Sequence, residues 1–116
     1  MIYSKSMAEL QTMNRCNALV LEILRKLEEV VAPGITTGDL DRMAEEWTVE
    51  AGAKPAFKGY RGYPATLCTS VNEQIVHGIP GRRRLEEGDI VGLDMGVIID
   101  GFYGDSAMTV PVGRVR

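Results

Sequence analysis

Two aspartates, Asp94 and Asp105, are the first candidates for chemistry in this sequence. Asp100-Gly101, between them, predicts a two-residue type I′ hairpin turn, because both central positions of that turn need a positive φ. In such a hairpin Gly96 faces Asp105, and Asp94 points to the same side as Gly96 because side chains alternate along a strand. The two carboxylates are then diagonal neighbours on one face of the sheet, about 7–8 Å apart at most.

Two carboxylates at this spacing repel each other unless a cation lies between them. A pair of divalent ions about 3.5–4 Å apart suits the arrangement, because carboxylates on neighbouring strands can ligate or bridge both ions. The alternative is a solvated sheet face that binds nothing. A three-residue loop without a bulge would also separate the aspartates onto opposite faces. The residues alone leave these interpretations open.

Four other side chains are weaker candidates when taken by themselves. His77 is the sole histidine, next to Gly78-Ile79-Pro80. A histidine at a strand end is either a structural hydrogen-bonding group or a proton donor in catalysis. Cys68 alone predicts a core thiol, and Tyr60 and Tyr63 belong to an expected exposed loop.

Two amphipathic helices are expected in the first half of the chain. Ser6-Met7-Ala8-Glu9 fits a capping box, and the helix that follows stops at Pro33-Gly34. Thr36-Thr37-Gly38-Asp39 starts a second helix, which ends at Gly52. The predicted buried positions are Leu10, Met13, Val20, Leu24, Leu27 and Val31 in the first helix and Leu40, Met43, Ala44 and Trp47 in the second.

Short strands are expected from Ala53 onward, between Gly, Pro and Asn residues. They span 53–57, 65–71, 74–77, 90–98 and 102–112, with a loop at 58–64 and a turn at Asn72-Glu73. Helices followed by antiparallel strands indicate an α+β fold with both helices on one face of the sheet. Residues 1–116 are expected to form a single domain.

Composition and charge narrow the range of partners. The chain is 45% hydrophobic and 25% charged, which is typical of a globular protein and not of a disordered one. A net charge of −3 gives no reason to expect nucleic acid, and Arg82-Arg83-Arg84 predicts a solvated turn. No membrane span or targeting leader is expected, and two cysteines without a secretory signal predict reduced thiols in the cytoplasm.

Two long segments, GYPATLCTSVNEQIVHGIP and EEGDIVGLDMGVIIDGFYGDSAMT, together resemble type I methionine aminopeptidases. The likeness covers essentially the whole chain and corresponds to the N-terminal half of the family's pita-bread α+β fold. In that fold two pseudo-symmetric halves surround a dinuclear metal centre. The resemblance implies removal of the initiator methionine from nascent polypeptides with two divalent ions of cobalt, manganese, iron or zinc.

The resemblance also implies roles for particular residues. Asp94 and Asp105 match the family's two aspartate metal ligands. His77 matches a catalytic histidine that hydrogen-bonds the substrate and helps to stabilise the tetrahedral intermediate. The pocket for the methionine side chain corresponds to Phe57, Tyr60, Tyr63 and Cys68, with Phe57 standing where some relatives carry a cysteine. A monovalent cation is implied near Asn72 and Gln74.

The family's remaining metal ligands, a histidine and two glutamates, belong to a second half that would begin where this sequence ends. Three interpretations follow. The chain is half of an enzyme whose missing C-terminal half completes the site, or a half-length relative that self-associates, or a non-catalytic fragment. A dimer would bring four aspartates together, an all-oxygen set that suits harder ions such as Mn or Mg, with little or no peptidase activity.

Overall fold

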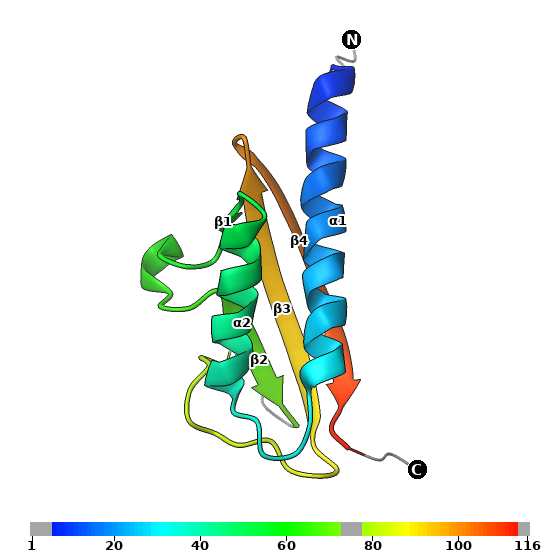
Figure 1. The fold of residues 1–116 in the computed structure, drawn as a ribbon. Coiled ribbons are helices and arrows are strands. Elements are labelled where there is room, and N and C mark those ends of the chain that lie inside the picture. The colour runs from blue at the N-terminus through cyan, green and yellow to red at the C-terminus, as the bar shows by residue number, and fades with distance from the viewer. Residues whose placement is uncertain (1–5, 73–77, 114–116) are drawn as a thin grey trace.

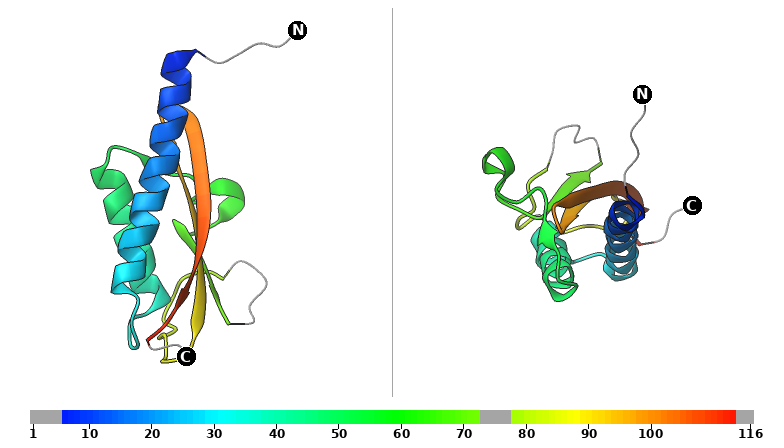
Figure 2. Two further views of the ribbon diagram at one scale, coloured as in Figure 1. Left: turned by 90° about the vertical axis from the view of Figure 1, so that its right-hand side faces the viewer. Right: turned by 90° about the horizontal axis from the view of Figure 1, so that it is seen from above.

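The computed structural model describes residues 6–72 and 78–113 of the chain. Within these ranges the elements are α1 (Met7–Val30), α2 (Thr37–Glu50), β1 (Lys54–Pro55), the short 3-10 helix η1 (Tyr60–Gly62), β2 (Leu67–Val71), β3 (Ile90–Ile99) and β4 (Phe102–Pro111). Both helices lie on the same face of a twisted antiparallel sheet (Figure 1, Figure 2). The predicted α+β arrangement is confirmed.

Both helices begin at the predicted capping boxes. The Glu9 N–H donates to Ser6 Oγ at 3.1 Å, and the Ser6 N–H donates to Glu9 Oε1 at 2.9 Å. Thr36 and Asp39 exchange the equivalent bonds at 3.0 and 3.1 Å. Each box satisfies backbone N–H groups that have no partner inside the helix. Gly52, with φ 81°, follows the end of α2 as predicted.

The core lies between the helices and the sheet, with two corrections in the N-terminal half of the predicted α1 stripe. Val20, Leu24 and Leu27 are buried as predicted. Leu10 is 43% exposed, because the first turns of α1 extend beyond the sheet (Figure 1). Cys16, absent from the predicted stripe, is fully buried, and its thiol donates to the Phe102 carbonyl oxygen at 3.2 Å.

The predicted buried face of α2 agrees with the structure. Leu40 and Ala44 are fully buried, whereas Met43 and Trp47 are half-buried and pack against the core. The Lys26 ammonium of α1 lies 5.3 Å from the centre of the Trp47 ring, a cation–π contact that joins the two helices. No helix among the described residues is both long enough and apolar enough to cross a membrane.

β3 is the central strand of the sheet. β4 pairs with its full length from Ile99 opposite Phe102 onward. Asp100 and Gly101 have φ values of 50° and 81°, so the predicted type I′ turn is confirmed. The other edge of β3 pairs with β2 over residues 91–95 and with β1 at residues 97–98. β1 and β2 therefore lie end to end along a single edge.

This shared edge corrects two predicted strands. The expected strand 53–57 is limited to Lys54–Pro55 in the structure. The residues of β3 that would pair next are already paired with β2, so the chain leaves the sheet after β1. The expected strand 65–71 begins only at Leu67, since the Thr66 N–H donates to the Asp41 carboxylate of α2. β4 ends at Pro111, one residue before the predicted end. The expected strand 74–77 lies outside the described residues.

Candidate functional site

Asp94 and Asp105 point away from the helices, to the open face of the sheet. Leu93, Met95 and Val97 of β3 are buried against the helices, so Asp94 points to the opposite side. Asp105 of β4 lies directly opposite Gly96 of β3, and opposed residues share a side of the sheet. Asp105 therefore lies on the same side as Asp94. The predicted arrangement on one face is confirmed, whereas metal binding by this pair stays a prediction.

Gly96 leaves room beside the carboxylates for an aromatic ring. A Cβ at this position would lie 3.2 Å from Phe57 Cε1 and 3.1 Å from the Gly104 carbonyl oxygen. Phe57 thus packs over the glycine on the same face as Asp94 and Asp105. A side chain at position 96 would displace this ring or the neighbouring strand.

Tyr103 is a neighbour of the aspartates that sequence reasoning did not single out. Its hydroxyl donates to Asp105 Oδ2 at 3.2 Å. Partial burial, followed by the negative charge of Asp105, raises the Tyr103 pKa, and Asp94 and Tyr60 add smaller contributions. The signal was present in the sequence, because residues 103 and 105 share one face of a strand.

A pocket of about 630 Å³ opens next to the two aspartates, Asp94 and Asp105. Its lining consists of Phe57, Tyr60, Arg61, Gly62, Tyr63, Pro64, Cys68 and Ile79. All four residues predicted to hold a methionine side chain therefore line the same pocket. Aromatic rings and a thiol are good neighbours for a thioether, although their role as substrate contacts stays a prediction.

Cys68 connects the pocket with the carboxylates. It lies opposite Asp94 in the β2–β3 pairing and is 6% exposed. Burial, with a contribution from Asp94, raises the pKa of the Cys68 thiol. Burial and interaction with Cys68 also raise the pKa of Tyr63, whose hydroxyl donates to the Leu67 carbonyl oxygen at 2.8 Å. Both groups are therefore uncharged at neutral pH.

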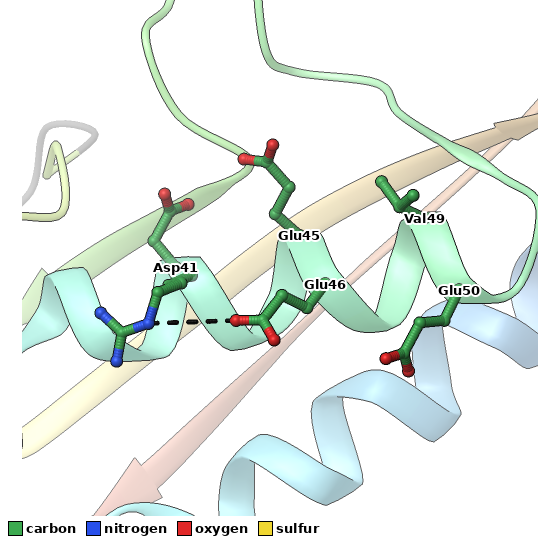
Figure 3. A pocket seen from close by; sticks show the side chains of 6 residues that line it. Asp41, Glu45, Glu46, Val49 and Glu50 are labelled. Atoms are coloured by element: carbon green, nitrogen blue, oxygen red, sulfur yellow. Dashed lines mark ion pairs between the residues drawn. The ribbon is translucent and has the colours of Figure 1, made fainter.

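Two acidic side chains of α2 fasten the loop that forms the pocket wall. Asp41 Oδ1 accepts the N–H groups of Thr66 and Leu67 at 2.9 and 2.8 Å. Glu45 Oε1 accepts from Lys58 Nζ at 2.8 Å and from the Thr66 hydroxyl at 3.2 Å. Figure 3 shows Asp41 and Glu45 on one side of the helix. The loop is thus tied to α2 at both ends. The i,i+4 spacing of Asp41 and Glu45 alone did not reveal this anchoring role.

The described residues contain the two predicted metal ligands and no larger cluster of ligands. Asp94 and Asp105 offer carboxylate oxygens suited to divalent ions. Within residues 6–72 and 78–113, however, no group of three or more His, Cys, Asp or Glu side chains could hold a metal ion. The two carboxylates are compatible with half of a dinuclear centre, and ligation by them stays a prediction.

Two predicted sites involve the segment that is not described. His77 and Gln74 lie outside the described residues. The Asn72 side chain donates to Asp89 Oδ1 at 3.0 Å and accepts the Ile90 N–H at 2.9 Å, so it holds the end of β2 against the start of β3. The monovalent cation near Asn72 stays a prediction.

The fold agrees with the comparisons. Residues 11–116 match the metallopeptidase family M24, and the chain belongs to this family. Within it, the chain is similar to methionine aminopeptidases. It is 46% identical to the methionine aminopeptidase of Clostridium acetobutylicum, over 99% of this chain and 46% of the relative. The corresponding protein of Borreliella burgdorferi is 49% identical, over 96% of this chain and 44% of the relative.

Solved structures also include methionine aminopeptidases that are similar to this chain. The methionine aminopeptidase of Rickettsia prowazekii matches with a TM-score of 0.93 and 35% identity, over 100% of this chain and 47% of its own. The prolidase of Pyrococcus furiosus, at 21% identity and a TM-score of 0.82, shares the fold alone. The predicted family resemblance is confirmed. The chain spans about half the length of the curated relatives that it matches.

Proposed function

We propose that this chain contributes half of the active site of a cytoplasmic, metal-dependent methionine aminopeptidase. The reaction is removal of the N-terminal methionine from nascent polypeptides. The observation that carries the proposal is a shared sheet face, where Asp94 and Asp105 adjoin a largely apolar pocket through Cys68. The named activity of similar proteins supports the same reaction.

Each part of the site has a task in this proposal. Asp94 and Asp105 hold divalent ions, which when bound supply Lewis acidity at the scissile carbonyl. The pocket around Tyr63 and Cys68 takes the methionine side chain and excludes water from it. His77 donates a hydrogen bond toward the developing oxyanion. The ion is cobalt, manganese, iron or zinc.

The remaining ligands come from elsewhere in this proposal. Two carboxylates alone do not hold a tight pair of transition-metal ions. Such a pair needs nitrogen or further carboxylate ligands and a second layer of hydrogen bonds that supports them. We assign these groups to the other half of the longer relatives. The active form is then the complete two-half enzyme.

Self-association is the second candidate, and the outer edge of β4 favours it. Among the described strands, β4 pairs only with β3, so its other edge forms no ladder with a described strand. A second copy pairing along this edge would bring two further aspartates to the site. Such a dimer binds Mn or Mg with little peptidase activity, whereas a non-catalytic fragment binds neither metal nor a second copy.

Metal binding provides the first test. Calorimetric titration with Mn²⁺ or Co²⁺ is expected to show binding to the unmodified protein, with loss of binding in Asp94→Asn and Asp105→Asn. Asp100→Asn is the matched control, because this exposed turn aspartate is paired with Arg15 and lies outside the proposed site. Unchanged binding in both site variants would falsify the shared metal site.

Activity and mass separate the candidates. Hydrolysis of a Met-Gly-Ser peptide with added Co, Mn or Fe, abolished by either site substitution, supports the peptidase. Metal-dependent doubling of the solution mass without hydrolysis supports the dimer. A monomer that neither binds metal nor cleaves the peptide supports the interpretation as a non-catalytic fragment.

A further inference from the structure

Arg61 occupies a backbone conformation that arginine rarely adopts. Its φ of 49° and ψ of 35° are left-handed, and it lies between Gly59 and Gly62, whose φ values are 85° and 81°. Glycine would adopt this geometry without steric cost, whereas an arginine is strained there. Strained residues of this kind cluster at binding sites, where the surrounding structure holds them.

The side chain of Arg61 lies at the rim of the pocket, beside Tyr60. Its guanidinium carbon lies 5.4 Å from the centre of the Tyr60 ring, within the range of a cation–π contact. Both residues line the pocket, and Tyr60 is 63% exposed. A cation–π contact does not consume the N–H donors of the guanidinium, which stay available to a ligand.

Arg61 also differs from Lys58, the other cation of this loop, in its surroundings. None of the ion pairs formed between described residues involves Arg61, whereas Lys58 of the same loop is paired with Glu45. Among the described residues that line the pocket, Arg61 is the one with a formal charge. An otherwise apolar pocket thus has a cation at its rim, without a carboxylate partner in the described part of the chain.

We infer that Arg61 binds a carboxylate that the peptide substrate carries downstream of its N-terminal methionine. The inference rests on the proposed function and adds a substrate class to it, namely methionyl peptides with an acidic group close to the N-terminus. The planar guanidinium binds a carboxylate through paired N–H donors. The carboxylate comes from an acidic side chain or from the C-terminus of a short peptide.

Peptide binding tests the inference without turnover. Calorimetry in metal-free buffer compares Met-Gly-Asp-Gly-amide with Met-Gly-Asn-Gly-amide, which differ by one charge at nearly equal shape. The acidic peptide is expected to bind about fivefold more tightly, the effect of one exposed ion pair, and the ratio should fall as salt is added. Met-Gly-Asn-Gly with a free C-terminus shows whether the terminal carboxylate has the same effect.

Two variants assign the preference to Arg61. Asn tolerates left-handed geometry, so Arg61→Asn removes the charge and keeps the loop conformation. The ratio between acidic and neutral peptides should fall to about one in this variant. Arg25→Gln, on the exposed outer face of α1, removes the same charge elsewhere and should leave the ratio unchanged. Equal binding of both peptides by the unmodified protein, or a preference that survives in Arg61→Asn, overturns the inference.

A third peptide separates this inference from the proposed function. Ala-Gly-Asp-Gly-amide has the carboxylate and lacks the methionine side chain. If methionyl peptides bind better than this peptide but show no preference for the acidic residue, the inference about Arg61 fails alone. If methionyl and alanyl peptides bind equally, or none binds, the assignment of this pocket to the methionine side chain fails and the inference about Arg61 fails with it, whereas metal binding and hydrolysis test the rest of the proposed function.

Discussion

Cys68 and Asp94 lie directly opposite each other across β2 and β3, so a buried thiol and a carboxylate share the open face of the sheet. A thiolate at Cys68 would be a second negative charge beside Asp94. The carboxylate therefore adds to the effect of burial, which is the main cause of the raised thiol pKa. This pair is the point where the pocket and the aspartates meet.

The first prediction concerns this electrostatic contact. Asp94→Asn should lower the pKa of Cys68, because the substitution removes the negative charge and leaves the burial. The measurement is the rate of Cys68 alkylation as a function of pH, followed by mass spectrometry of the peptide so that Cys16 does not contribute. Asp100→Asn, at the exposed hairpin turn, should leave the profile unchanged. An unaltered or raised thiol pKa in Asp94→Asn contradicts the prediction.

The second prediction concerns the close approach of α1 to β4. A Cβ on Gly104 would lie 2.8 Å from the Cβ of Cys16 and 3.0 Å from the backbone nitrogen of Asn17. Gly104→Ala should therefore lower the free energy of unfolding by about 1–3 kcal/mol, the usual cost of overpacking. Urea denaturation measures this change.

Gly92 offers a matched control for this substitution. It lies in β3, and a Cβ there would meet its nearest heavy atom at 3.7 Å, an ordinary contact distance. Gly92→Ala should change the free energy of unfolding by less than about 0.5 kcal/mol. Equal effects of the two substitutions would show that the helix does not pack on Gly104 as described.

The third prediction concerns the anchoring of the pocket wall. Asp41→Ala leaves the N–H groups of Thr66 and Leu67 without their acceptor. We expect a loss of about 1–3 kcal/mol in the free energy of unfolding and faster hydrogen exchange at these two amides. Glu46→Ala, one turn further along α2, removes only a 3.9 Å exposed contact with Arg42 and should cost less than about 0.5 kcal/mol.

Two outcomes would count against this anchoring role. Similar losses of stability in the Asp41 and Glu46 variants would mean that the backbone bonds contribute little. Unchanged exchange at the two amides in Asp41→Ala would mean that another group holds the start of β2. Native mass and circular dichroism of both variants show whether the fold is retained.

The fourth prediction concerns acid stability. Hydrogen bonds from the Thr36 backbone and side chain lower the pKa of Asp39, and the Glu86 N–H and the Asn72 amide lower that of Asp89. A carboxyl whose folded-state pKa lies below its unfolded value stabilises the fold above the unfolded pKa, and this contribution is lost as pH falls through the folded pKa. The free energy of unfolding should therefore decline below about pH 4.

A single substitution tests the sign of this effect. Asp39→Asn should flatten the acid limb of the stability curve measured by urea unfolding between neutral pH and about pH 3. Asp41 acts in the opposite direction, because burial raises its pKa and its protonation favours the folded state. An acid limb that is identical with and without Asp39 contradicts the prediction.

The hairpin and the helix starts were predictable because their signals are local. Asp100-Gly101 fixes the turn type, the turn fixes the register, and alternation then places Asp94 and Asp105 on one face. The capping boxes at Ser6 and Thr36 fix the helix starts in the same way. These parts of the site follow from neighbouring residues alone.

The remaining features depend on contacts between distant segments. The length of β1 is limited by β2, which pairs with the same edge of β3. The burial of Cys16 depends on Gly104, far along the chain. The left-handed conformation of Arg61 has no local signal of its own, since arginine disfavours it. Periodicity and turn residues therefore left the shape of the pocket undetermined.

The chain between β1 and β2 departs from the sheet and rejoins it along the same edge of β3. Its inner residues, from Gly59 to Pro64, form no ladder with a described strand, so the register of the sheet sets neither their number nor their identity. Selection can thus vary the wall of the pocket, Arg61 included, while the hairpin with both aspartates stays unchanged. The proposed substrate preference and the proposed metal ligation are in this sense separately evolvable within a single small sheet.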